Sequence, residues 1–376
     1  MELDQLALFR KHCSDFLTRE ATPYIAQWET MGLVSRDFWR HAGEAGLLGM
    51  GVEAIYGGGA RQNYHYANVL TEELIKAQMT APVMISHNDV IASYISTLGT
   101  EEQKQRWLPG LCRGELIAAI AVTEANGGSN SSELETTAVK EGVYYRVNGN
   151  KRFITNGINA DLILTAVKTP EVQRGQGMSL LIIERNMQGF QRSQAHEKIG
   201  WRASDTADLF FDDCLVPSDN LIGREGLGNL YFMGGMPRER LSISGVAVAT
   251  SELMLTTTLE WVKKRKAFGQ TVGSFQHNRF VLAELDTEVR IARLYLNDAI
   301  NKFNDRTLTV VDAARIKLWT TELQVKVADR CLQLHGGSGY LSDSLIGRCW
   351  TNSRVQTIYG GTSEVMKEFV SKSMGL

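Results

Sequence analysis

The segment at residues 121–130 contains the first residue types that suit ligand binding. It reads AVTEANGGSN, an apolar run followed by small and hydroxyl residues. Such a loop exposes backbone N–H groups that can bind a phosphate or a heteroaromatic ring, although an ordinary turn has the same composition. A second hydroxyl and amide cluster, FITNG at 153–157, closes a strand-like run, and its Thr beside an aromatic residue is also typical of strands alone. Both segments are candidate ligand contacts.

Two glycine-rich breaks interrupt the helical pattern late in the chain, QLHGGSGY at 333–340 and IYGGTSE at 358–364. Each is explained by a helix C-cap followed by an N-cap, and Thr362 or Ser363 is suited to cap the last helix. Two such breaks also indicate a close approach of backbone to a bound molecule.

Glu239 is the acidic residue whose position matters most. Pro237 suits the first position of a helix, which predicts that Glu239 lies in the first turn. A carboxylate there commonly does no more than complement the helix dipole, so position alone leaves its role open.

Composition and motifs exclude several classes of protein. The 376 residues include 40 basic and 42 acidic side chains, which disfavours nucleic-acid binding and polybasic membrane binding. No apolar run reaches the ~18 residues of a membrane span, and the N-terminus lacks a secretion pattern, so we expect a cytoplasmic protein. Five cysteines without a C-x-x-C pair fit a reducing compartment. Seven histidines without H-E-x-x-H predict no metal site.

Hydrophobic periodicity predicts three regions. Residues 2–118 have a helical period, 119–221 hold short strands around a hairpin at Asn148-Gly149, and helices are expected near 238–266, 275–304, 309–335 and 343–371. We therefore expect an α+β multidomain chain: an N-terminal helical bundle at 1–118, a middle β-barrel or sandwich at 119–221 and a C-terminal four-helix bundle at 222–376.

Seven ordered blocks together resemble the acyl-CoA dehydrogenase family over nearly the whole chain. They are AVTEANGGSN (121–130), GNKRFITNGINAD (149–161), DTADLFFDDCLVPSDNLIGREGLG (205–228), RERL (238–241), RKAFGQTVGSFQ (265–276), QLHGGSGY (333–340) and IYGGTSEV (358–365). The family's fold, a helical bundle, a β domain and a four-helix bundle, is similar to the order expected above.

The resemblance implies FAD as cofactor, bound between the β domain and the C-terminal bundle with help from a neighbouring subunit. The matching cofactor-binding positions are Val122, Thr123, Ser129, Phe153, Thr155, Arg265, Phe268, Gln276, Gln333, Gly337, Thr362 and Glu364. It also implies substrate contacts at Ser129, Arg240, Gly360 and Gly361. The loop at 121–130 departs from the family's TEPGAGSD, with Ala125-Asn126 in place of Pro-Gly and Asn130 in place of Asp.

The resemblance also assigns a catalytic base. Most of the family places a Glu in the tyrosine-Glu-Gly-Thr block, where this chain has Gly360, whereas the long-chain and isovaleryl members place it in an E-R-L segment that matches Glu239-Arg240-Leu241. We therefore expect Glu239 to be the base. A first-turn position would lower the pKa of Glu239 and burial would raise it, and exclusion of water by the substrate favours the raised value.

The implied activity is dehydrogenation of an acyl-CoA to the trans-2-enoyl-CoA in fatty acid β-oxidation. The implied partners are the acyl-CoA substrate, an electron-transfer flavoprotein and further copies of the chain in a homotetramer, a dimer of dimers. Two alternatives stay open: action on acyl groups tethered to a carrier protein or direct use of oxygen, and a non-catalytic subunit of a hetero-oligomer. Acyl length and branching are not predicted.

Overall fold

The first third of the chain is helical in the computed structural model, which describes residues 2–79, 83–129, 133–169 and 177–376. This confirms the helical period of that region. The α-helices are α1 (Glu2–Glu20), α2 (Ile25–Met31), α3 (Arg36–Glu44), α4 (His65–Lys76), α5 (Val83–Ile85), α6 (Ala92–Leu98) and α7 (Glu101–Cys112), and a π-helical segment, Ser86–Ile91, joins α5 to α6. Thr100 and Gln103 form a capping box that starts α7.

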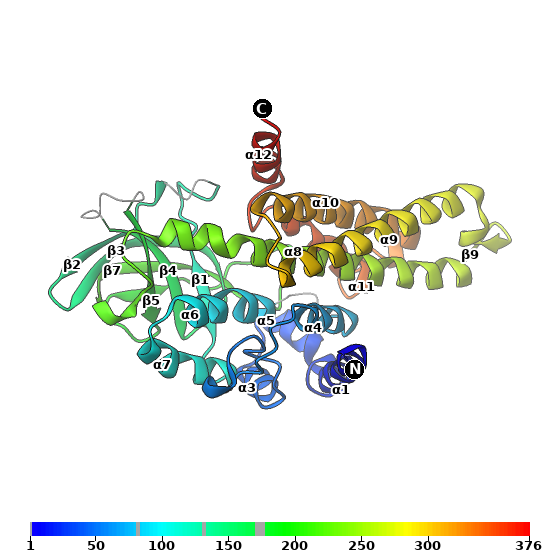
Figure 1. Cartoon of the computed structure of the whole chain (residues 1–376). Coiled ribbons are helices and arrows are strands. Elements are labelled where there is room, and N and C mark those ends of the chain that lie inside the picture. The colour runs from blue at the N-terminus through cyan, green and yellow to red at the C-terminus, as the bar shows by residue number, and fades with distance from the viewer. Residues whose placement is uncertain (1, 80–82, 130–132, 170–176) are drawn as a thin grey trace.

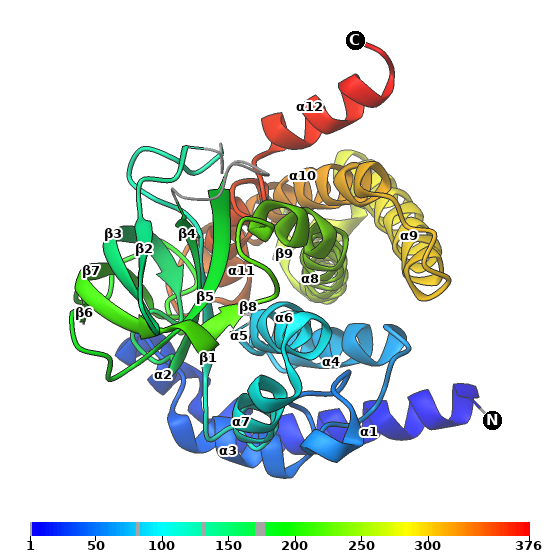
Figure 2. The ribbon, with the colours of Figure 1, turned by 60° about the vertical axis from the view of Figure 1, so that its left-hand side comes forward.

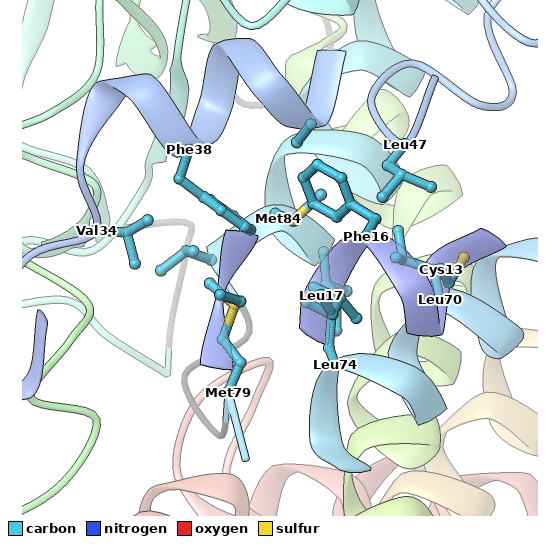
Figure 3. Packing of buried hydrophobic residues seen from close by; sticks show 14 of the residues in the cluster. Cys13, Phe16, Leu17, Val34, Phe38, Leu47, Leu70, Leu74, Met79 and Met84 are labelled. Atoms are coloured by element: carbon cyan, nitrogen blue, oxygen red, sulfur yellow. The ribbon is translucent and has the colours of Figure 1, made fainter. Parts of the chain in front are cut away.

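Apolar residues at helical spacing hold the N-terminal helices together. Phe16 and Leu17 of α1 pack with Leu70 and Leu74 of α4, and all four are at most 2% exposed. Figure 3 shows these side chains together with Phe38 of α3. Removing such a side chain costs several kcal/mol, typically about 2–5 for a buried leucine. This cluster therefore fixes the helices that lie below α8 in Figure 1.

The middle of the chain forms one sheet. Its strands are β1 (Ala118–Ala121), β2 (Thr137–Glu141), β3 (Tyr144–Thr155), β4 (Leu162–Lys168), β5 (Met178–Glu184), β6 (Phe190–Arg192), β7 (Thr206–Pro217) and β8 (Leu221–Ile222). Their order is β6-β7-β3-β2-β4-β5-β8, with β1 parallel to β4. In the described part of the chain this path stays open and does not close into a barrel.

The hairpin expected at Asn148-Gly149 is wrong. Both residues lie inside β3, which runs unbroken from Tyr144 to Thr155. The hairpin turn lies instead at Gly142 (φ +62°), between β2 and β3. Gly149 is at a bulge, where a Cβ atom would lie 2.6 Å from the Cα of Thr136. Glycine is needed at this position because the backbone at Thr136 approaches it closely.

Long helices return after the sheet. They are α8 (Gly228–Lys264), α9 (Gln276–Asn304), α10 (Val310–His335), α11 (Leu345–Ser353) and α12 (Ser363–Ser373), with β9 (Lys266–Ala267) and β10 (Gln270–Thr271) as a small ribbon after α8. The single helix expected near 343–371 is two helices separated by a 3-10 turn, Arg354–Thr357. Pro237 does not start a helix, because α8 begins nine residues earlier.

Helix α8 is the central element of the molecule. It packs against α10, α9 and α4, and its first part contacts β5. Figure 1 shows it running from the sheet to the small β9 ribbon, and Figure 2 shows it between α10 and the N-terminal helices. No helix among the described residues is both long and apolar enough to cross a bilayer.

Candidate active site

The position of Glu239 on α8 differs from the expected one. It lies 11 residues after the helix start at Gly228, three turns into the helix. The field of a helix N-terminus falls off within the first turn, so the dipole does not act on this carboxylate. The expected contribution that would lower its pKa is therefore wrong.

Gly360 lies directly beside the Glu239 carboxylate. A Cβ atom built on Gly360 would be 3.7 Å from Oε1 of Glu239 and 2.3 Å from Cδ1 of Ile243. Gly360 (φ +64°) and Gly361 (φ +90°) both adopt the left-handed conformation that favours glycine. The Gly360–Gly361 turn thus lies beside the proposed base, and a side chain at position 360 would meet both Ile243 and the Glu239 carboxylate.

Burial raises the pKa of Glu239, and the positive charges of Arg240 and Lys317 oppose that rise. In the described part of the chain no group is hydrogen bonded to the Glu239 carboxylate, which is only partly exposed. Free carboxylate oxygens with a pKa above the ordinary value suit a general base, which must gain a proton near neutral pH.

Arg240 is directed away from solvent and toward α12. Its side chain is among the largest that are fully buried; the guanidinium lies 4.6 Å from the ring centroid of Phe369, and Nη1 donates to the carbonyl of Val310 at 3.4 Å. Its Nε has no partner in the described residues. The substrate-binding role expected of Arg240 remains a prediction.

Two tyrosines flank the Glu239 carboxylate. Its negative charge, together with burial, raises the pKa values of Tyr94 on α6 and Tyr359. The hydroxyl end of Tyr94 packs closely against α8, because a Cβ on Gly235 would lie 2.3 Å from its hydroxyl oxygen. Tyr359 places its ring edge against Trp201 at a centroid distance of 5.1 Å. The base therefore lies where α6, α8 and the Gly360–Gly361 turn meet.

Five cofactor candidates lie on the sheet side of the molecule. Val122, Thr123 and Ser129 follow β1, and the carbonyls of Val122 and Thr123 accept from Lys151 Nζ (3.2 Å) and Arg152 N (2.8 Å) of β3. Ser129 is exposed. The adjoining Asn130 is outside the described residues. The remaining two of the five are on β3.

Phe153 and Thr155 lie at the end of β3. Phe153 has φ +58° and is 58% exposed, and its amide donates to Asp208 Oδ1 at 3.1 Å. A strained, exposed aromatic residue is typical of a functional surface. Thr155 pairs with Thr206 of β7.

Backbone hydrogen bonds and one ring contact link the end of β3 to the region of the base. The amide of Asn156, next to Thr155, donates to the carbonyl of Asp205 at 3.0 Å. The amide of Ser204 donates to the carbonyl of Trp201 at 3.0 Å, and Trp201 contacts Tyr359. The sheet candidates and Glu239 are therefore on two sides of one junction.

A cavity of about 340 Å³ adjoins this junction. It is lined by Glu322 and Val325 of α10, the 354–358 segment and the start of α12. Thr362 caps α12, accepting from Val365 N at 3.2 Å, and Glu364 lies in its first turn. A helix N-terminus beside Arg354 suits a phosphate group, and the carboxylates suit ribose hydroxyls. These residues fit part of FAD.

Five further cofactor candidates gather at the far end of α8. They are Arg265, Phe268, Gln276, Gln333 and Gly337, and all are exposed, Phe268 at 95%. Arg265 is 26 residues from Glu239, about 39 Å along the helix axis, and His335, at the end of α10, stacks on Trp261 of the last turns of α8. Figure 1 shows this end opposite the sheet. Within one chain the two groups do not meet.

Residues missed by the sequence analysis also lie at the site. Lys317 of α10 is fully buried and donates to the carbonyl of Gly361 at 2.7 Å. A lysine among small and apolar residues in a helix was the signal that could have identified it. Arg354 in the cavity and the buried Glu124–Lys151 pair behind Val122 had no comparable local signal. No cluster of three or more metal-ligating side chains occurs among the described residues.

Comparison with known proteins identifies the family. Three family models match: acyl-CoA dehydrogenase N-terminal domain at 4–115, middle domain at 119–214 and C-terminal domain at 226–375. The mitochondrial long-chain specific acyl-CoA dehydrogenase of Sus scrofa is 39% identical over 98% of this chain and 86% of its own.

Two solved structures have the same fold. The acyl-CoA dehydrogenase from Geobacillus kaustophilus superimposes with a TM-score of 0.97 at 42% identity, covering 99% and 98% of the two chains. A prolyl acyl carrier protein oxidase superimposes with a TM-score of 0.92 at 29% identity, covering 99% of each. With three family models matching along its length and relatives of the same fold, the chain belongs to the acyl-CoA dehydrogenase family of FAD-dependent oxidoreductases.

Proposed function

We propose that this chain oxidises an acyl-CoA to the trans-2-enoyl-CoA, with Glu239 as the base. The observation that carries the proposal is the Glu239 carboxylate, which has no hydrogen-bond donor among the described residues, a raised pKa and the Gly360–Gly361 turn beside it. Glu239 takes the proton from the α carbon of the thioester. FAD, when bound, supplies the acceptor for the hydride that leaves the β carbon. The substrate thus loses two protons and two electrons: one proton goes to Glu239, and the other leaves with both electrons as the hydride.

The surrounding residues determine how this base works. Ile243 and the Tyr94 ring exclude water from one side of the carboxylate, which favours proton transfer. The cofactor-binding roles proposed for five residues are supported by where they lie. Thr123 follows β1, Phe153 and Thr155 lie at the end of β3, and Thr362 and Glu364 line the adjoining cavity.

The test is anaerobic flavin reduction by CoA thioesters of graded length and branching. Glu239→Gln removes the base but keeps the shape of the side chain, so flavin reduction should slow by at least the ~100-fold typical of general-base loss. Glu260→Gln, an exposed position on the same helix, is the matched control and should react like the unmodified protein. Undiminished reduction in Glu239→Gln would refute the assignment.

A second candidate function is oxidation of an acyl group tethered to a carrier protein, with oxygen as the electron acceptor. The structural similarity to the prolyl acyl carrier protein oxidase supports it. The two functions are separated by offering the same acyl group on CoA and on a carrier protein, and by adding an artificial electron acceptor with and without oxygen. The E-R-L position of Glu239 and the long-chain relative favour the CoA substrate.

We also propose a shared cofactor site in a dimer of dimers. The roughly 39 Å between Glu239 and Arg265 supports it, because the exposed group at the end of α8 can complete a site only on another chain. The same proposal includes an electron-transfer flavoprotein as the electron acceptor and β-oxidation as the pathway. It also includes domain limits at 118/119 and 221/222 and a role for Ser129 and Gly361 in substrate binding. Five free, buried cysteines support a cytoplasmic location.

A further inference from the structure

Lys317 is a fully buried lysine in the middle of α10. On the same face of α10, Ala313 and Ala314 precede it by one turn and Thr320 and Thr321 follow it by one turn, all at most 1% exposed. A buried ammonium group costs much more free energy than an apolar side chain of the same volume unless it is compensated. No carboxylate forms a salt bridge with Lys317 within the described residues, so its presence requires a different explanation.

Among the described residues, the Lys317 ammonium group makes one hydrogen bond, and it is to the turn beside the base. Its Nζ donates to the carbonyl of Gly361 at 2.7 Å. Gly360 and Gly361 adopt left-handed conformations and have no side chains to hold the turn in place. The ammonium group therefore fixes the backbone that faces Glu239.

The charge of Lys317 also acts on the Glu239 carboxylate. The groups that face Glu239 are Arg240 on its own helix, Lys317 from α10, Tyr94 from α6 and Tyr359 from the turn. The two cations oppose the effect of burial on the carboxylate. Arg240 contacts Val310 and Phe369, whereas Lys317 binds the turn that lies beside Glu239.

We propose that Lys317 is a positioning residue for Glu239: it anchors the Gly360–Gly361 turn beside the carboxylate, and its charge favours the ionised, proton-accepting form. Burial and the nearby Arg240 lower the pKa of Lys317 itself to about 8, while the charges of Glu239, Glu322 and Glu364 raise it. The ammonium form therefore prevails at neutral pH. The consequence for catalysis rests on the proposed function of Glu239, but the electrostatic coupling does not.

The experiment is an infrared titration of the holoenzyme that follows the protonated carboxyl band of Glu239, assigned by its loss in Glu239→Gln. Lys317→Met removes the charge and keeps the chain length, and Lys317→Gln removes the charge and keeps a hydrogen-bond donor. Lys326→Met is the matched control, because Lys326 lies on the same helix, is about half exposed and pairs with Glu288. Thermal stability and FAD content are recorded for each variant.

Both Lys317 variants should raise the midpoint of the Glu239 band by about one pH unit or more, as expected when a unit charge that interacts with the carboxylate is removed. The pH at which flavin reduction reaches half its maximal rate should rise by the same amount. Lys326→Met should change neither. If Lys317→Met fails to fold, Lys317→Gln carries the test.

An unchanged Glu239 midpoint in a folded Lys317 variant would overturn the proposal, even where stability or FAD content falls. That result would assign Lys317 to packing of the bundle alone. Failure of the proposed function is a different outcome: Glu239→Gln would then reduce flavin at the normal rate, while the infrared midpoint would still report the coupling between Lys317 and Glu239.

Discussion

Transfer of the catalytic carboxylate from position 239 to position 360 tests the proposed active site. The Cβ position of Gly360 is 3.7 Å from the Oε1 atom of Glu239. A glutamate at 360 would therefore project its carboxylate into the volume that the Glu239 side chain occupies. In the Glu239→Gln background, Gly360→Glu should restore part of the lost proton abstraction.

The structure predicts what this transfer costs. Position 360 has φ +64°, and a residue other than glycine in that conformation loses about 1–2 kcal/mol. The new Cβ would also lie 2.3 Å from Cδ1 of Ile243. Ile243→Val removes that methyl group at a cost of about 0.5–1.5 kcal/mol. The triple variant, which combines Glu239→Gln, Gly360→Glu and Ile243→Val, should thus be about 2–3 kcal/mol less stable than the unmodified protein, with a lower Tm.

The assay is anaerobic stopped-flow bleaching of flavin absorbance with a saturated acyl-CoA that the unmodified protein oxidises. Glu239→Gln should fall by at least ~100-fold, and adding Gly360→Glu with Ile243→Val should recover at least tenfold of that loss. Gly360→Glu in the presence of Glu239 should be neutral or harmful, because two adjacent carboxylates raise the apparent pKa values of the pair. A folded, FAD-loaded triple variant without any recovery would refute the shared position.

Three further predictions concern assembly, the sheet and pH. Arg265→Ala should weaken FAD retention and self-association together, measured by absorbance and sizing, with the exposed Lys263→Ala as control. Lys151→Met should cost about 3–5 kcal/mol in denaturant unfolding, because it leaves Glu124 buried without its partner; adding Glu124→Gln should recover part of it. Glu239→Gln should gain thermal stability relative to the unmodified protein as pH rises above about 4.3, because the raised pKa of Glu239 makes the unfolded state lose its proton first.

Helical periodicity predicted much of the fold, but tertiary contacts decided several boundaries. The short strands expected within 119–221 are present as β1 to β7, and β8 ends one residue beyond that range. The Asn148-Gly149 dipeptide gave a wrong turn, because the need for glycine there comes from Thr136, just before β2, a contact that no local rule contains. The start of α8 was also misplaced, because Pro237 suits a helix start but lies nine residues inside the helix. Pro237 is tolerated inside the helix, although proline removes one backbone hydrogen bond there.

The candidate site could be predicted only in part. Glu239 followed from the E-R-L segment, and Thr362 was expected as a helix cap and is one. Lys317 was not predicted, because its importance depends on Gly361, which is 44 residues later in the chain. The separation of Arg265 from the sheet candidates also required the length of α8 as a continuous helix.

The packing around Gly360 explains why the two locations of the base exclude each other. A side chain at 360 and the Ile243 methyl group compete for one space, and a carboxylate at 360 would meet the one at 239. Glycine at 360 leaves room for both Ile243 and Glu239, and it permits the left-handed turn that Lys317 anchors. Moving the base between α8 and the turn therefore requires residues 239, 243 and 360 to change together. Substitution of Gly360 alone brings two like charges into contact, whereas a coordinated change moves one charge across a distance of a few ångström.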